Sequence, residues 1–171
     1  MITKKINLYV VLSIIVLVAS GCTLKAEEKV LEDVEIAAEK IFKQEKSISP
    51  NKELKSISVY LPVDFTVTEE STSNVILEKG DQTFILFYNP LEDSKSELNY
   101  EAASAADNIV LLESLEDDDR FGYISVLELK DDRYELQLGI GGVKITTRTS
   151  MGNLENDAEN MMEIVSSIDD N

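Results

Sequence analysis

The sequence has no histidine and no tryptophan, and it contains a single cysteine, Cys22. Without histidine the chain offers neither a Ser-His or Cys-His nucleophilic pair nor a His-ligated zinc or non-haem iron site. Without tryptophan it lacks the aromatic side chain that stacks best on cations. Neither a GxGxxG motif nor a GxxxxGK[ST] loop occurs. We therefore expect no cofactor and no catalytic activity, because only carboxylates, lysines and hydroxyls remain for side-chain chemistry.

Basic residues are also scarce. The 171 residues include 16 lysines and arginines against 33 aspartates and glutamates, for a formal net charge of −17. Nucleic-acid phosphates are neutralised by lysine and arginine, so this balance argues against nucleic acid as a partner. It also disfavours direct contact of the folded domain with an anionic lipid surface. We expect the acidic surface to keep the domain soluble and to meet a protein partner.

The first 21 residues have the three parts of an export signal. Lys4 and Lys5 supply a positive start, an almost unbroken apolar run covers residues 8–18, and small residues end the segment. The apolar run has about eleven residues, whereas a membrane-spanning helix needs about 20. We therefore predict a signal peptide over residues 1–21 rather than an uncleaved membrane anchor. Its removal would change the formal net charge to −19, since both lysines leave with it.

The run from Leu17 to Cys22 resembles the lipobox of bacterial lipoproteins, with Ala19 where that family usually has leucine. The resemblance implies cleavage between Gly21 and Cys22. It further implies a diacylglycerol on the Cys22 thiol, with or without an N-acyl chain, and two or more acyl chains make a durable anchor. The expected location is the extracytoplasmic face of the cell membrane. A composition rich in Ile, Lys and Glu favours a Gram-positive source.

Residues 22–56 are predicted to form a lipidated tether that contains an amphipathic helix. Residues 26–46 place apolar side chains at helical spacing, with Glu and Lys between them. The apolar stripe consists of Val30, Leu31, Val34, Ala37, Ala38, Ile41 and Phe42. Such a stripe must be buried, either on the domain's own sheet or on a partner, as in helix-in-groove binding. The polar residues 47–56 then connect the helix to the domain.

From Ile57 onward the apolar residues follow a period of two, which predicts β-strands. The predicted strands lie near residues 57–61, 65–67, 75–78, 83–88, 109–115, 122–129, 134–140 and 143–149. Residues 84–87 are apolar on both faces, which is typical of a strand in the middle of a sheet. Gly141 and Gly142 can supply the positive φ of a tight hairpin. A short helix is expected near residues 100–106, within a polar segment over 91–108.

A closing helix is predicted to begin at Asn153. Its apolar face consists of Leu154, Ala158, Met161, Met162, Val165 and Ile168. Methionines at this spacing fit core packing, and an adaptable binding surface is the alternative. Residues 57–171 are thus expected to form an α+β domain, with an antiparallel sheet of about seven or eight strands packed with an N-terminal and a C-terminal helix.

Two stretches of this domain resemble PsbP-like and DcrB-like domains. The first runs through residues 58–62 and 65–67, a strand followed by Leu-Pro and an aromatic residue; the second is the strand 144–147 that leads to a helix ending at 164–168. The similarity covers residues 55–169 and concerns the order of elements. The C-terminal domain of some Gram-positive anti-sigma factors and lipoproteins ends in a comparable strand and helix. Both families imply a non-catalytic accessory or binding role outside the cytoplasm, and neither supplies functional residues to carry over.

The densest acidic cluster includes Asp117 and Asp119, which are candidate calcium ligands because Ca²⁺ prefers oxygen donors. An EF-hand loop needs ligands at alternate positions and a late glutamate, whereas residues 117–119 are consecutive aspartates followed at once by Arg120. The pattern favours a solvated hairpin turn, so we expect no metal site here.

Tyr88 and Tyr100 flank the polar segment and are the aromatic residues that the sequence leaves exposed, whereas Phe87 and Tyr123 fit the core. We take Tyr88 and Tyr100 as a candidate interaction surface. The function expected is that of a membrane-anchored accessory or interaction domain. The alternative is a lipoprotein that binds a small ligand or hydrolyses a substrate with carboxylates, and it predicts a concave pocket with carboxyl groups of raised pKa.

Overall fold

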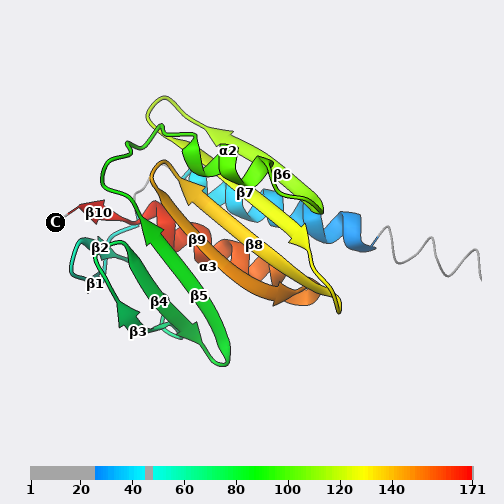
Figure 1. Cartoon of the computed structure of the whole chain (residues 1–171), viewed down its shortest axis with the longest axis horizontal. Helices are drawn as coiled ribbons and strands as arrows, with labels where there is room; N and C mark the ends of the chain where they lie inside the picture. The colour runs from blue at the N-terminus through cyan, green and yellow to red at the C-terminus, as the bar shows by residue number, and fades with distance from the viewer. Residues whose placement is uncertain (1–25, 45–47, 171) are drawn as a thin grey trace, which may run out of the picture.

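The computed structural model describes residues 26–44 and 48–170, which form an α+β domain around one antiparallel sheet (Figure 1). Seven strands follow the order β3-β4-β5-β9-β8-β7-β6. Their bounds are β3 (Thr66–Glu70), β4 (Asn74–Lys79), β5 (Gln82–Tyr88), β6 (Ile109–Glu116), β7 (Phe121–Glu128), β8 (Arg133–Ile140) and β9 (Val143–Ser150). The predicted fold class is confirmed. The signal peptide, its cleavage site between Gly21 and Cys22, and the lipidation site lie outside the described residues.

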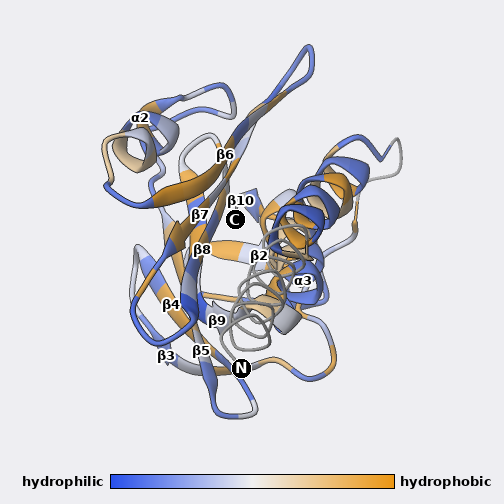
Figure 2. Ribbon diagram, turned by 90° about the vertical axis from the view of Figure 1, so that its right-hand side faces the viewer, coloured by the Kyte–Doolittle hydropathy of each residue, from blue (hydrophilic) through white to orange (hydrophobic). Residues whose placement is uncertain are grey.

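Helices cover the two faces of this sheet unequally (Figure 2). The N-terminal helix, residues 26–42, and α3 (Leu154–Ser166) lie on one face, which we call the inner face. The short helix α2 (Leu98–Ser104) lies on the opposite, outer face and contacts β6 and β7. A 3-10 turn, η1 (Met151–Asn153), joins β9 to α3. Among the described residues, no helix combines the length and the apolar character needed to cross a membrane.

The core lies between the inner face and the two larger helices. Strands β8 and β9 alternate as predicted, so their inward side chains are buried while Lys144 and Arg148 point to the outer face. Buried residues that meet there include Phe84, Leu86, Leu136, Leu138 and Ile145 from the sheet and Leu154, Ala158, Met161, Met162 and Val165 from α3. Met161 and Met162 are therefore core residues. Strand β5 lies inside the sheet, but Ile85 is 46% exposed because α2 does not extend over it.

The N-terminal helix packs on the domain's own sheet. Val34, Ala38 and Phe42 are fully buried in the same core cluster as β7 and β8. The Arg120 guanidinium lies 4.6 Å from the centroid of the Phe42 ring, and its Nη2 donates a 2.8 Å hydrogen bond to the Phe42 carbonyl. The helix thus belongs to the folded domain. The division predicted between a tether over 22–56 and a domain over 57–171 does not separate two units, because an amphipathic stripe does not reveal which surface buries it.

A second, small sheet differs from the prediction. Strand β2 (Ile57–Val59) does not join the main sheet but pairs with β1 (Lys52–Glu53) and with β10 (Asp169–Asp170) from the end of the chain. After β2 the chain turns, and the Phe65 amide donates to the Pro62 carbonyl at 3.0 Å. Strands of two residues show no period, so β1 and β10 leave no sequence pattern to detect.

A buried carboxylate fastens α3 to the sheet. Asp157, in the first turn of α3, is 2% exposed. Its Oδ2 accepts hydrogen bonds from the Thr149 hydroxyl at 2.7 Å and from the Gln82 amide at 2.8 Å, and the Lys79 ammonium lies 3.9 Å from Oδ1. Because a buried charge is costly unless it is hydrogen-bonded and paired, these partners are needed where β5, β9 and α3 meet.

Two other carboxyl groups are placed where ionisation is unfavourable. Burial raises the pKa of Glu35 on the N-terminal helix, and the charges of Glu113, Glu39 and Glu32 raise it further. Burial also raises the pKa of Glu163 on α3. A carboxyl group whose folded-state pKa is raised binds its proton more tightly in the folded than in the unfolded state. Its contribution to stability is full below the unfolded pKa, about 4.3, and is lost as the pH rises through the folded pKa.

We expect the melting temperature to rise as the pH falls from 7 toward 5, because protonated Glu35 no longer opposes folding. Glu35→Gln should raise the melting temperature at pH 7 by about 1–3 °C and flatten this pH dependence. Thermal denaturation followed by circular dichroism at several pH values measures both. Glu155→Gln, on the exposed side of α3, removes one charge elsewhere and controls for net charge. An identical pH profile in both variants would contradict the prediction.

Candidate functional site

A groove of about 430 Å³ opens at the end of the sheet where β8 turns into β9. We call it the Tyr88 groove. Its apolar lining is contributed by Ile140 and Val143 from that turn, by Val165 and Ile168 near the end of α3, and by Tyr88 and Pro90. Its polar lining is contributed by Glu92, Asp93, Ser94, Arg120, Ser166 and Asp169. The groove therefore combines an apolar floor with a rim that is mainly acidic.

Glycine at the β8–β9 turn lets the segment over residues 89–97 lie directly on the sheet end. Gly141 has φ +53°, in the left-handed region that glycine adopts readily. A Cβ on Gly141 would overlap the Asp93 carbonyl oxygen and lie 2.7 Å from Cα of Ser94. A Cβ on Gly142 would lie 2.6 Å from the Asn89 carbonyl oxygen. The two glycines, predicted as a hairpin turn, thus also shape the groove wall.

Asp117 closes the β6–β7 turn beside the groove. Its Oδ1 accepts from the backbone amides of Asp119 at 3.0 Å and Arg120 at 2.8 Å. Its Oδ2 accepts from the Arg120 guanidinium at 2.6 and 3.0 Å. The hydrogen bond from the Arg120 side chain is the main reason why the pKa of Asp117 lies below its usual range. The Asp117 carboxylate is thus engaged within its own turn, and Arg120 is held where it lines the groove.

The candidate calcium ligands are not arranged around a common point. Asp119 contributes its backbone to the turn, where its carbonyl accepts a 2.8 Å hydrogen bond from the Ser94 hydroxyl. Within residues 26–44 and 48–170, no three side chains of His, Cys, Asp or Glu are grouped so that they could hold a metal ion.

The two tyrosines chosen from the sequence lie on different surfaces. Tyr88 lines the groove. Tyr100, on α2, packs edge-on against Phe121 and Tyr123 on the outer face, with ring centroids 5.5 and 6.3 Å apart. Tyr123 is buried, as predicted, whereas Phe87 is half-buried on the outer face, with the Lys144 ammonium 5.7 Å from its ring centroid. The structure therefore does not join Tyr88 and Tyr100 into one interaction surface.

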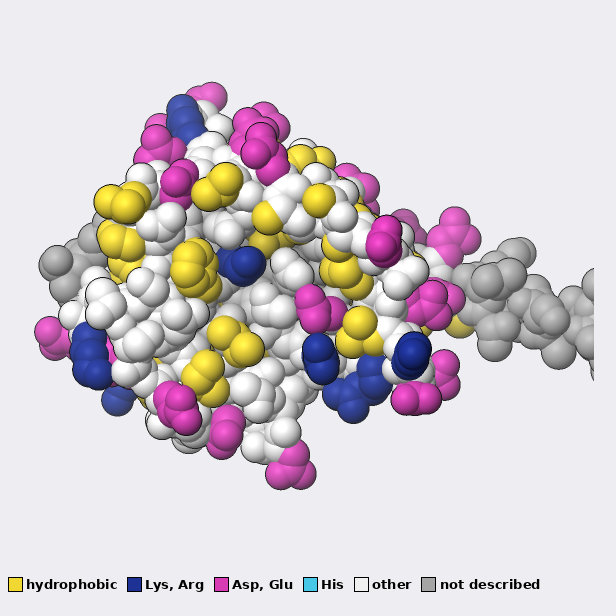
Figure 3. Space-filling view, viewed as in Figure 1, with side chains coloured by type: hydrophobic (Ala, Val, Ile, Leu, Met, Phe, Trp, Pro, Cys, Tyr) yellow, Lys and Arg dark blue, Asp and Glu magenta, His cyan; other side chains and the backbone are white. Residues whose placement is uncertain are grey.

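A wider hollow of about 770 Å³ lies on the outer face near the opposite end of the strands. Its lining includes three cations, Lys79, Arg133 and Arg148, together with Glu135 and several threonines. The Arg133 guanidinium donates to the carbonyls of Thr149 and Arg148 at 3.2 and 3.1 Å. Lysine and arginine side chains gather at this end of the outer face, and carboxylates lie both beside them and around the rest of the face (Figure 3). The basic side chains of this face are thus clustered, whereas the acidic ones are spread over it.

The carboxyl groups with raised pKa, Glu35 and Glu163, line neither the Tyr88 groove nor the hollow. The convergence of such groups in a pocket, which a carboxylate-dependent hydrolase would need, is not found among the described residues. Tyr134, whose pKa burial raises to about 12, lies instead beside the N-terminal helix, where its hydroxyl donates to Glu27 at 3.2 Å.

The residues of the groove that the sequence did not single out are Glu92, Asp93, Arg120 and the end of α3. Tyr88, chosen as a candidate interaction residue, and the Gly141-Gly142 pair, predicted as a turn, marked this place in the sequence. No protein-family model matches the sequence, and a search of curated proteins finds no match. Function is therefore inferred from the geometry and from the chemistry of the chain itself.

Proposed function

We propose that the protein is a lipoprotein anchored at Cys22 on the extracytoplasmic face of a cell membrane, and that its domain is a non-catalytic interaction module. In this proposal the Tyr88 groove receives a segment of a protein partner. The observation that carries the proposal is the groove itself, in which buried apolar side chains form the floor and carboxylates form the rim. The resemblance of residues 55–169 to PsbP-like and DcrB-like domains implies a role of the same kind.

The groove defines the chemistry of the segment that would fit it. Ile140, Val143 and Val165 are each less than 10% exposed, so they offer an already formed apolar surface. Burying one aliphatic side chain there would contribute about 1.5–3 kcal/mol. Asp93 and Asp169 are exposed at the rim, where they attract cations. The expected ligand is therefore a segment with an apolar anchor residue flanked by lysine or arginine, which the acidic rim also steers toward the groove.

The proposal is tested with the lipidated full-length protein in its own membranes. A photoreactive benzoylphenylalanine replacing exposed Pro90 at the groove should form a crosslink to one partner, and mass spectrometry should locate the crosslink at an apolar residue near lysine or arginine. Reversing two rim charges, Glu92→Lys with Asp93→Lys, should lower the crosslinked yield by at least about tenfold, since like charges brought together across an interface cost several kcal/mol.

The matched control reverses two exposed carboxylates away from the groove, Glu78→Lys with Glu155→Lys. It changes the net charge equally and should leave the crosslink intact. Equal losses of crosslinked yield in both double variants would mean that the effect comes from net charge. That result would contradict binding of the partner at the groove. Membrane attachment is checked separately by Cys22→Ala, which should release the protein from the membrane fraction. Retention of that variant would reject the anchor.

A further inference from the structure

The main sheet ends in two edge strands that differ in length and composition. Strand β3, at one edge, has five residues, a register shift between Val67 and Glu69, and mostly polar side chains. The Lys55 ammonium donates a 3.0 Å hydrogen bond to the Glu70 carbonyl of this strand. Short length, bulges and lysine are the features that keep an edge strand from pairing with another chain. Strand β3 is therefore well protected.

Strand β6, at the other edge, is less protected. It has eight residues, and β7 is the one strand that pairs with it in the described part of the chain (Figure 1). Its register shift lies near its start, so residues 111–116 form six consecutive pairs with β7. Its first four residues, 109–112, are apolar and only partly buried. A long, apolar edge of this kind is typical of a site where a further strand can be added.

The hydrogen-bonding groups of β6 point outward at every second residue. The Asp117 amide donates to the Arg120 carbonyl at 3.1 Å, which fixes the phase of the β6–β7 ladder. In an antiparallel pair, residues alternate between those that bond to the neighbouring strand and those that do not. Residues an even number of positions before Asp117 therefore bond to β7. The residues between them turn their N–H and C=O groups away from β7, and these are Leu112, Ser114 and Glu116.

Carboxylates on the inner side of this edge define the charge of a strand that would fit it. Glu113 is exposed and lies near Glu35 on the N-terminal helix, where burial raises the pKa of Glu35 and the Glu113 charge raises it further. No ion pair among the described residues includes Glu35 or Glu113. Lys29 and Lys43 pair instead with other carboxylates of the helix. A cation on an added strand would therefore reduce a repulsion that the chain leaves unrelieved.

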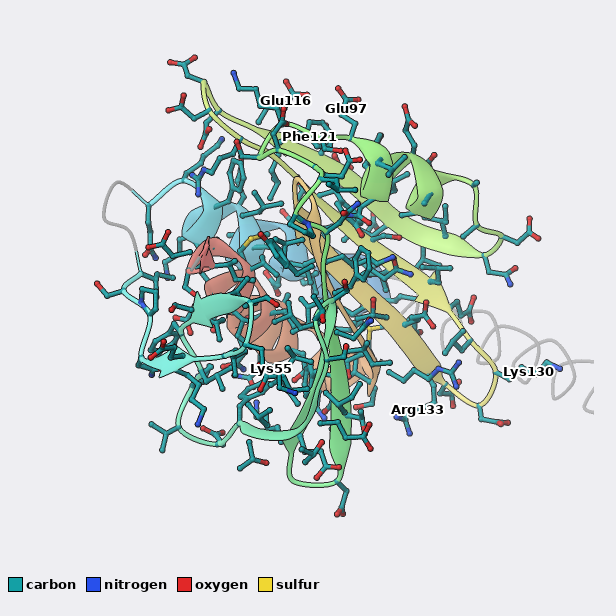
Figure 4. All side chains as sticks on the ribbon, turned by 60° about the vertical axis from the view of Figure 1, so that its left-hand side comes forward. Lys55, Glu97, Glu116, Phe121, Lys130 and Arg133 are labelled. Atoms are coloured by element: carbon teal, nitrogen blue, oxygen red, sulfur yellow. The ribbon has the colours of Figure 1, made fainter. Side chains whose placement is uncertain are left out.

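The outer side of the edge is acidic near the β6–β7 turn. Glu116 is exposed there, and Glu97, which precedes α2, lies toward the same end of the molecule (Figure 4). Arg120, the cation of this turn, is bound by Asp117 at 2.6 Å. Opposite charges directly across two strands are favourable. Lysine or arginine on an added strand would thus find carboxylates on both sides of β6.

A second copy of the chain fits this edge less well than a different protein does. Pairing β6 with itself would bring Glu113, Glu116 and Glu35 of two molecules together, and each molecule has a formal net charge of −17. Like charges directly across two strands are destabilising. A partner strand that carries cations avoids this repulsion.

We propose that the free edge of β6 binds an extended, basic segment of a partner protein as an eighth strand of the main sheet. In the antiparallel arrangement one lysine or arginine lies opposite Glu116, and a second lies opposite Glu113, three residues later. Two apolar residues follow, opposite Leu112 and Leu111. Backbone hydrogen bonds hold the segment, and the side chains select it. This site is separate from the Tyr88 groove and does not depend on the lipid anchor.

The probe is a capped, fluorescein-labelled peptide, Thr-Lys-Thr-Thr-Lys-Val-Val-Thr, whose binding to the full-length protein in mild detergent is measured by fluorescence anisotropy. A second peptide carries N-methyl groups on the three residues that lie opposite Leu112, Ser114 and Glu116. It keeps every side chain but loses the N–H donors, so it should bind at least about tenfold more weakly. Equal binding of the two peptides overturns strand addition.

A pair of variants tests the edge itself. Ser114→Pro removes an outward N–H and places a ring on the open side of β6, a position where sheets tolerate proline. It should weaken peptide binding by at least about tenfold, whereas Ser114→Thr keeps the N–H and should bind like the unmodified protein. Thermal denaturation checks that both variants fold. Unchanged binding by folded Ser114→Pro overturns the proposal, and the charge variants decide if this variant does not fold.

The charge variants test the choice of a basic partner. Glu113→Gln with Glu116→Gln should weaken peptide binding severalfold. Glu69→Gln with Glu78→Gln changes the net charge equally on β3 and β4, away from β6, and should leave binding unchanged. Equal losses in both double variants overturn the pairing of lysines with Glu113 and Glu116.

Two further measurements separate this site from the alternatives. Glu92→Lys with Asp93→Lys, which alters the groove rim, should bind the peptide as well as its matched control does. A loss confined to the rim variant assigns the peptide to the groove and overturns the edge site, whereas normal peptide binding without any crosslink at position 90 overturns the groove alone. Sedimentation of the protein without peptide should show a monomer. A dimer that Ser114→Pro disrupts makes β6 a contact between copies and overturns the basic partner.

Discussion

Phe42→Ala is expected to lower the free energy of unfolding by about 3–5 kcal/mol, as for other fully buried phenylalanines. The Phe42 ring is 0% exposed and lies between the Arg120 guanidinium and β7, where a Cβ on Gly122 would approach Cε2 of Phe42 to 2.9 Å. Removing the ring would leave a cavity and deprive Arg120 of its cation–π partner. Equilibrium unfolding in urea, followed by circular dichroism, measures the loss.

The control for this substitution lies on the same helix. Ile36 is 52% exposed, so Ile36→Ala changes helix composition without opening the core and should cost less than about 1 kcal/mol. If both variants lose the same stability, the N-terminal helix is not part of the core and residues 22–56 act as a tether. Should Phe42→Ala fail to fold, Phe42→Leu keeps most of the volume and should show a smaller loss with the same sign.

Gly141→Ala is expected to lower the free energy of unfolding by about 2–5 kcal/mol, from two sources. The left-handed φ of +53° costs an alanine roughly 1–2 kcal/mol. The new Cβ would also overlap the backbone at Asp93 and Ser94, and overpacking of this kind costs about 1–3 kcal/mol. Because the groove wall rests on this turn, the substitution should also lower crosslinking of the partner at position 90.

Gly80 provides a matched comparison. It has φ +59°, and a Cβ there would meet no atom within 4 Å. Gly80→Ala therefore carries the backbone strain alone, about 1–2 kcal/mol, and should leave crosslinking unchanged. The difference between the two variants in urea unfolding isolates the contact between the turn and residues 89–97. Equal losses in the free energy of unfolding would mean that the contact of the turn with residues 89–97 contributes nothing to stability, because this segment moves aside without cost.

The elements that the sequence predicts well are those with one buried face. Tyr134, Leu136 and Leu138 alternate with polar residues because one side of β8 meets helices, and the turn at Gly141 fixes where β9 begins. The apolar face of α3 is equally regular, for the same reason. Where one face of an element is buried, apolar residues recur with the period of that element, so the element can be predicted from the sequence.

The remaining features depend on distant segments coming together. The apolar stripe on residues 26–42 would have the same sequence pattern whether it packed on a partner or on β7. Only the structure shows which surface buries it. The groove combines residues near 88–94, 120, 140–143 and 165–169, and no local spacing relates these four stretches. Tyr88 and Tyr100 flank one polar segment in the sequence, yet α2 carries Tyr100 to the outer face and Tyr88 stays at the sheet end.

The docking of the N-terminal helix also determines the order in which the chain can fold. Its hydrogen bonds join Phe42 to Arg120 and Glu27 to Tyr134, pairs that are 78 and 107 residues apart. The first part of the domain to be synthesised therefore gains its main contacts only after β7 and β8 exist, and such non-local contacts slow folding. If Cys22 is lipidated as proposed, the residues around it would stay attached to an unfinished domain during that interval, which would leave time for processing and acylation before the fold closes.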